Sequence, residues 1–175
     1  NARTELARSQ TLAASQAAFY EDNRFADAFA SLVRAPEPVA RALEAIPGIA
    51  ALETRVVVRV NLDVPGLAEP ARGRIVSMPR GSGGGLNALH VLRGRLPAPG
   101  RADEVLASEA FAKANGLEPG DVVRAVMNGR YQALRIAGIG ISPEYIYALG
   151  PGQLVPDNRR YGVLWMERKA LATAY

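Results

Sequence analysis

The segment RVVVRVNLDV at residues 55–64 constrains the fold most strongly. Apolar residues occupy every second position, at Val56, Val58, Val60 and Leu62, and alternate with Arg55, Val57, Arg59 and Asn61. Because successive side chains of a strand point to opposite faces, this period of two predicts a half-buried strand. The turn residues Pro65 and Gly66 follow, and ARGRIVSMP then predicts a second strand over 71–78 as its hairpin partner.

A second block of predicted elements begins near Leu89. EVLAS predicts a strand from Glu104, Ser108 is expected to cap a helix through Ala114, and Gly116 fits a left-handed helix end. DVVRAVM and YQALRIAGIGI predict two strands joined at Asn128-Gly129, a strong hairpin signal. Further on, the sequence predicts a helical turn over 144–148, a strand over 162–168 and a helix over 169–175.

The N-terminal third gives weaker signals. Residues 2–21 favour a helix with a thin apolar face, which suits a stalk, a contact with a partner or a frayed end. Residues 25–33 predict a strand. PEPVARALEAIPGI places Val39, Leu43 and Ile46 at helical spacing, so a short amphipathic helix packed on a sheet is expected there.

Composition excludes several classes of protein. With 175 residues, 49% of them hydrophobic, the chain can form one compact domain or two small subdomains. The net charge of +4 comes from scattered arginines without an aromatic stripe between them, which favours a solvated surface over a nucleic-acid site. The absence of cysteine excludes disulfides and thiolate chemistry. The chain has no apolar run of membrane-spanning length, and its two ends suggest a piece of a longer protein.

No motif of the sequence predicts catalysis. RGSGGG at 80–85 is not followed by Lys-Ser/Thr or by a helix, so it is interpreted as a linker between subdomains, not a phosphate loop. His90, the only histidine, lacks a G-x-S-x-G partner motif. The acidic pairs Asp103/Glu104 and Glu118/Asp121 fit turns better than a metal or glycosidase site. We therefore expect no catalytic residue, no cofactor and no metal, and hence a protein that is not an enzyme.

The loop after residue 141 holds the candidate contact residues Tyr145, Ile146, Tyr147 and Leu149. Tyrosines on a loop can anchor a protein partner or a ligand. They can equally tuck beneath the loop as a small satellite core, and the sequence leaves both interpretations open.

Three stretches together resemble a known family. They are AIPGI with the valine-rich strand after it, LRGRLPAPGRADEVLASEAFAKANGLEPGDVV, and the NGR hairpin leading into LRIAGIGISPEYIY. Over residues 25–170 this pattern is similar to the extracytoplasmic domain of MacB/FtsX-type ABC transporter permeases. The loop over 142–162 departs from it, so lipoprotein release, macrolide efflux and cell-division signalling remain alternatives.

The resemblance implies an α+β fold: a porter-like α/β sandwich subdomain with an inserted, mainly β subdomain, preceded by an N-terminal stalk helix. In this division, residues 1–22 form the stalk continuing from a membrane span, 23–80 plus 160–175 the porter-like subdomain, 88–142 the inserted subdomain and 143–159 a return segment. The resemblance also implies a place on the periplasmic side of a bacterial inner membrane, with flanking membrane spans outside the chain.

The resemblance further implies a function without a chemical step of its own. A separate ATP-binding subunit or domain would hydrolyse ATP, and this domain would couple that work to a substrate or a periplasmic protein partner. A second permease copy is expected, and no nucleic acid. Two other hypotheses stay open: a freestanding extracytoplasmic binding module that uses the Tyr145/Tyr147 loop, and an enzyme centred on His90.

Overall fold

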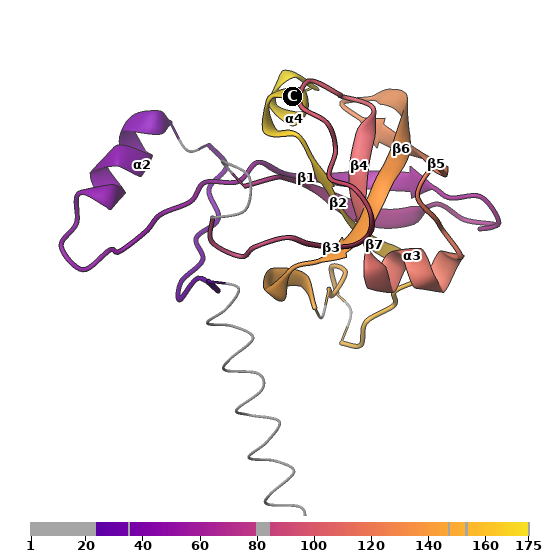
Figure 1. Cartoon of the computed structure of the whole chain (residues 1–175), viewed down its shortest axis with the longest axis horizontal. Helices are drawn as coiled ribbons and strands as arrows, with labels where there is room; N and C mark the ends of the chain where they lie inside the picture. The colour runs from indigo at the N-terminus through magenta and orange to yellow at the C-terminus, as the bar shows by residue number, and fades with distance from the viewer. Residues whose placement is uncertain (1–23, 35, 80–84, 147, 153, 175) are drawn as a thin grey trace, which may run out of the picture.

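The computed structural model describes residues 24–34, 36–79, 85–146, 148–152 and 154–174 (Figure 1). The predicted stalk at 1–22 and most of the glycine linker lie outside these residues. The fold is mixed α/β. Its elements are α2 (Glu37–Glu44), β1 (Val57–Asp63), β2 (Ala71–Ser77), β3 (His90–Gly94), β4 (Glu104–Ser108), α3 (Glu109–Asn115), β5 (Val122–Met127), β6 (Arg130–Ile141), the 3-10 turn η1 (Pro143–Tyr145), β7 (Tyr161–Met166) and α4 (Arg168–Ala174).

The seven described strands form one sheet that closes on itself. Their order is β3-β6-β4-β7-β2-β1-β5, and β5 pairs in turn with β6. The long strand β6 makes closure possible, because its first half pairs with β5 and its second half pairs with β4. Six strands therefore form a barrel, and β3 is added outside the ring against the end of β6. Closure leaves fewer unpaired strand edges than an open sheet would have.

The main hydrophobic core fills this barrel. Leu62, Ile75 and Ile136 come from three different strands and are fully buried there. Phe111 of α3 and Leu171 of α4 belong to the same cluster. In Figure 1, α4 lies above the strands and α3 below them, so the two helices close the barrel at its ends. Full burial of each large apolar side chain contributes about 1.5–3 kcal/mol.

The predicted strands and turns of the barrel are largely confirmed. In β1, Val60 and Leu62 are buried while Arg59 and Asn61 are exposed, as the alternation requires. β2 is the antiparallel partner of β1. Asn128 and Gly129 have φ angles of 46° and 74°, as the expected tight hairpin needs, and Gly116 ends α3 with φ 64°. The predicted helical turn at 144–148 is a shorter 3-10 turn over 143–145.

Ser108 does not cap α3 in the predicted way. It occupies the position before the helix, but its hydroxyl makes no capping hydrogen bond. The hydroxyl accepts a hydrogen bond from the Val163 N–H at 3.4 Å instead. The side chain thus links the end of β4 to β7, a contact between residues 55 positions apart in the sequence.

Two predictions for the region before the barrel are wrong. Residues 25–33 form no strand, and Phe29 and Leu32 are 56% and 60% exposed. The predicted helix is present as α2, but Val39 and Ile46 of its apolar face are exposed, not packed on a sheet. Residues 24–34 and 36–52, here named the N-terminal arm, lie to one side of the barrel in Figure 1. The first residues of the arm are bonded to Asn87, whose side-chain oxygen accepts a hydrogen bond of 3.1 Å from the Ala26 N–H. Strand formation needs a paired neighbour, and the described residues supply none to this segment.

A polar junction holds the arm to the barrel. Arg55 donates hydrogen bonds to the carbonyls of Ser77 and Leu86, at 3.2 and 2.7 Å, and forms an ion pair of 3.3 Å with Glu53. Arg168 at the start of α4 binds the carbonyl and the hydroxyl of Thr54. The chain is therefore fixed at residues 53–56, immediately before β1 begins.

The sheet joins the segments that the sequence divides between two subdomains. β7, β2 and β1, from residues 23–80 and 160–175, are neighbours in the ring, and so are β5, β6 and β4, from residues 88–142. The two groups are joined where β1 pairs with β5 and where β4 pairs with β7. The two segments thus share one sheet and one core cluster. Pairing between strands this far apart in sequence is not encoded in any local pattern, which is why the periodicity of each strand did not reveal it.

Candidate functional site

The charged stretch at residues 93–121 is held by ion pairs within the fold. Arginine and carboxylate side chains meet in three pairs, Arg93–Glu118, Arg95–Glu104 and Arg101–Asp103. In the second pair, both guanidinium Nη atoms lie 2.7 Å from the two carboxylate oxygens. Two-pronged pairs of this kind fix geometry as well as charge. The pairs tie turns to strands, so the structural interpretation of these acidic residues is supported.

Among the carboxyl groups of this stretch, Glu104 has the pKa that departs most from its ordinary value. It is buried at the start of β4, where its Oε2 also accepts a hydrogen bond of 3.0 Å from the Ala98 N–H. The hydrogen bond from Arg95, followed by that from Ala98, outweighs burial and lowers the pKa of Glu104 to about 2. A carboxyl group with this pKa is ionised at neutral pH and holds no proton to donate as a general acid.

His90 begins β3, the strand at the edge of the sheet, and its side chain is exposed. That His90 has no catalytic role stays a prediction. Among the described residues, no group of three His, Asp or Glu side chains is placed to hold a metal ion. In the same part of the chain, no helix has both the length and the apolar character to cross a membrane.

Tyr145 belongs to a second hydrophobic cluster on the outside of the sheet. Its ring meets the Trp165 ring edge-on, with 6.0 Å between centroids. Arg74 lies 5.5 Å from the centroid of the same ring and donates a hydrogen bond of 2.7 Å to the Tyr161 hydroxyl. Burial, reinforced by a hydrogen bond with Glu144, raises the pKa of Tyr145. Tyr145 therefore packs as the satellite-core interpretation expects.

Two of the other loop candidates are exposed and do not belong to the cluster around Trp165. Ile146 and Leu149 are each 44% exposed, and Tyr147 lies outside the described residues. The partner-binding role assigned to this loop therefore stays a prediction, and it now concerns Ile146 and Leu149 more than Tyr145.

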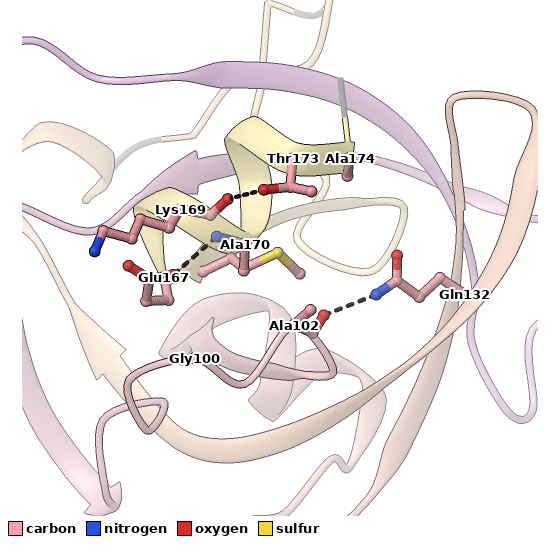
Figure 2. A pocket seen from close by; sticks show the side chains of 9 residues that line it. Gly100, Ala102, Gln132, Glu167, Lys169, Ala170, Thr173 and Ala174 are labelled. Atoms are coloured by element: carbon pink, nitrogen blue, oxygen red, sulfur yellow. Dashed lines mark hydrogen bonds between the residues drawn. The ribbon is translucent and has the colours of Figure 1, made fainter.

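A cavity of about 410 Å³ lies at the end of the barrel beside α4 (Figure 2). Some of its polar groups make local hydrogen bonds: Gln132 donates to the Ala102 carbonyl at 2.7 Å, and Glu167 accepts from the Ala170 N–H at 2.8 Å. Lys169 also lines the cavity. Small or apolar groups such as Gly100, Ala102 and Met166 form much of the remaining wall. This lining suits an apolar side chain better than a reacting polar substrate.

Sequence reasoning missed the importance of Arg74. The sequence analysis interpreted the arginines as a group as parts of a solvated surface and singled out none of them. The signal that could have singled out Arg72 and Arg74 is their place opposite β1, whose outer side also carries Arg59. That juxtaposition needs the register between the two strands.

The chain matches no family model and no curated protein. Among solved structures, it is similar to the extracellular domain of YknZ, a noncanonical ABC-type transporter from Gram-positive bacteria. The sequence identity is 14% and the TM-score is 0.47. The similarity covers 77% of this chain and 63% of that one, so the chain spans less than two thirds of that structure's length.

Proposed function

We propose that this chain is the extracytoplasmic domain of an ABC transporter permease of the MacB/FtsX type. The observation that carries the proposal is the placement of its family-like sequence blocks. The blocks LRGRLPAPGRADEVLASEAFAKANGLEPGDVV and the NGR hairpin follow one another as β3, β4, α3, β5 and β6. Three of these are barrel strands, β3 pairs with β6 outside the ring, and α3 packs on the barrel core. A pattern that spans one continuous structural unit is more informative than the same motifs scattered over a fold.

The geometry suits a domain that transmits motion. The strands close into a ring, α3 and α4 pack on the core, and ion pairs such as Arg95–Glu104 tie the turns to the strands. Close-packed interiors of this kind are hard to compress and transmit displacement. In this proposal the domain performs no chemical step and needs no cofactor. A separate ATP-binding subunit hydrolyses ATP, and the domain passes the resulting movement to a substrate or a periplasmic protein.

The proposal is tested by locating the domain in cells. The chain has no cysteine, so Tyr131→Cys, at a position that is 77% exposed, introduces a single labelling site here. It would be placed in the full-length protein, freed of any other cysteine. A membrane-impermeant maleimide should then label intact spheroplasts as strongly as lysed ones, and the protein should copurify with its ATP-binding subunit.

The matched control is a cysteine in the ATP-binding subunit, which should react only after lysis. Labelling of residue 131 only after lysis would overturn the placement outside the cytoplasm. A full-length protein in the soluble fraction without an ATP-binding subunit would overturn the transporter assignment and favour the freestanding binding module.

A further inference from the structure

Three arginines gather on the outer wall of the barrel where β1 and β2 pair. Arg59 of β1 lies directly opposite Arg74 of β2, and Arg72, two residues along β2, lies opposite Asn61. The pattern of burial places all four side chains on the outer face, with Arg59 and Arg72 exposed. Directly opposed side chains on one face of an antiparallel pair are close neighbours, and like charges in that position destabilise the pair.

The fold does not neutralise this arginine patch, here defined as Arg59, Arg72 and Arg74. Other arginines have carboxylate partners, among them Arg55, Arg93, Arg95, Arg101 and Arg124. Within the described ranges, the structure shows no ion pair for any member of the patch, and the same holds for isolated exposed arginines such as Arg41 and Arg130. Arg74 is held by the Tyr161 hydroxyl and by the rings of Tyr145 and Tyr161, which fix its position without cancelling its charge.

The shape and spacing of the patch indicate the chemistry of its partner. Arg72 and Arg74 are alternate residues of one strand, so their side chains repeat every ~7 Å. An extended polypeptide with acidic residues at alternate positions has the same repeat. Asn61 adds an amide that can donate to a carboxylate or to a peptide carbonyl.

The surroundings of the patch favour a narrow partner over a broad anionic surface. Asp63 and Glu69 have side chains that are 53% and 77% exposed, and they sit close to the patch, in β1 and in the turn before β2. A flat anionic bilayer lying on this wall would also meet these carboxylates, whereas a single extended segment need not.

We propose that Arg59, Arg72 and Arg74, with Asn61, form a docking site for an acidic, extended segment of a partner protein. The site accepts carboxylates through guanidinium groups that have no carboxylate partner among the described residues. The inference goes beyond the proposed function because it concerns the 175-residue chain itself, whether or not that chain is anchored to a membrane.

The probe is a synthetic peptide in which glutamate alternates with threonine, and binding is measured by fluorescence anisotropy at low ionic strength. We expect the double variant Arg59→Gln/Arg72→Gln to raise the dissociation constant about tenfold. The matched control Arg41→Gln/Arg130→Gln removes the same charge from two other exposed positions and should change it less than about twofold. Added salt should weaken binding of the unaltered chain.

Thermal unfolding supplies a second readout that needs no ligand. Because Arg59→Gln removes one of two like charges at directly opposed positions, we expect it to raise the melting temperature by about 1 °C. Arg95→Gln, which removes the partner of Glu104, should lower it. A fall on Arg59→Gln would mean that the side chain is a structural support and would contradict the proposal.

Several outcomes would overturn the docking site. Equal losses in the patch and control variants would show an effect of net charge alone, and equal binding of a glutamine–threonine peptide would exclude carboxylate recognition. If the patch variant lost affinity only for phosphatidylglycerol vesicles, the site would belong to a membrane surface. Competition by inorganic phosphate as strong as that by the peptide would identify a general anion site. None of these results bears on where residue 131 is labelled, so the two proposals fail separately.

Discussion

The barrel and the N-terminal arm contain similar apolar residues, but these are buried in the barrel and exposed in the arm. Leu62 in β1 is fully buried, whereas Leu32 in the arm is 60% exposed. Both regions contain a segment with strand-like alternation, and both contain an amphipathic helix. The barrel strands each have partners on both sides, while the described residues give the arm no paired strand. The comparison shows that alternation predicts which side chains would share a face, and that a neighbour decides whether the face is buried.

The largest expected difference between the two regions is in the stability lost when the same substitution, leucine to alanine, is made in each. Leu62→Ala leaves a cavity inside the barrel and should lower the free energy of unfolding by about 3–5 kcal/mol. Leu32→Ala should change it by less than about 0.5 kcal/mol, because the side chain is already largely in water. Urea denaturation followed by circular dichroism measures both values. Comparable losses in the two variants would mean that the arm is packed in solution.

Removing an aromatic ring should also affect stability differently in the barrel and in the arm, by a smaller amount. Tyr145→Ala removes the edge-on contact with Trp165 and the ring beside Arg74, so we expect a loss of about 2 kcal/mol. Phe29→Ala in the arm, where the ring is 56% exposed, should cost much less. Thermal unfolding distinguishes the cases. Unchanged stability after Tyr145→Ala would restore the loop tyrosine as a free contact residue.

The smallest effect concerns charge and pH. The pKa of Glu104 is about 2 in the folded chain and near 4.5 when unperturbed, so the unfolded state binds the proton more readily. Its contribution to stability is therefore complete above about pH 5 and is lost as the pH falls toward 2. Glu104→Gln should lower the midpoint urea concentration at pH 7. The midpoint of this variant should also fall less steeply than that of the unaltered chain as the pH is lowered. Glu44→Gln, at an exposed position of the arm, should leave the profile unchanged.

The sequence predicted the barrel elements better than the arm. Val60 and Leu62 face the core as their spacing required, Asn128-Gly129 forms the hairpin turn, and Gly116 ends α3. β3 was missed because its five residues are all exposed and give no alternation of buried and exposed positions. Of the candidate site residues, Tyr145 is tied into the cluster around Trp165, and Ile146 and Leu149 remain accessible.

The arginine patch shows why part of the candidate docking site could not be predicted from the sequence. Arg59 and Arg74 each follow the alternation of their own strand, but no local signal says that they stand opposite one another. The sequence also showed no sign that both faces of β7 are buried. Val163 and Trp165 are covered by the outer cluster. Leu164 and Met166 face the barrel core. In both cases the deciding contact is with a residue far away in sequence.

The sequence by itself determined the local features of this protein: where strands run, which side chains share a face, where turns reverse the chain and where α3 stops. Those features depend on backbone preferences and side-chain alternation within a few residues. Only the tertiary structure decided that β6 closes the ring, that the arm stays outside it and that three arginines share the outer face of the β1–β2 pair. These outcomes depend on the register between distant segments, which is set by the burial that the whole chain achieves at once.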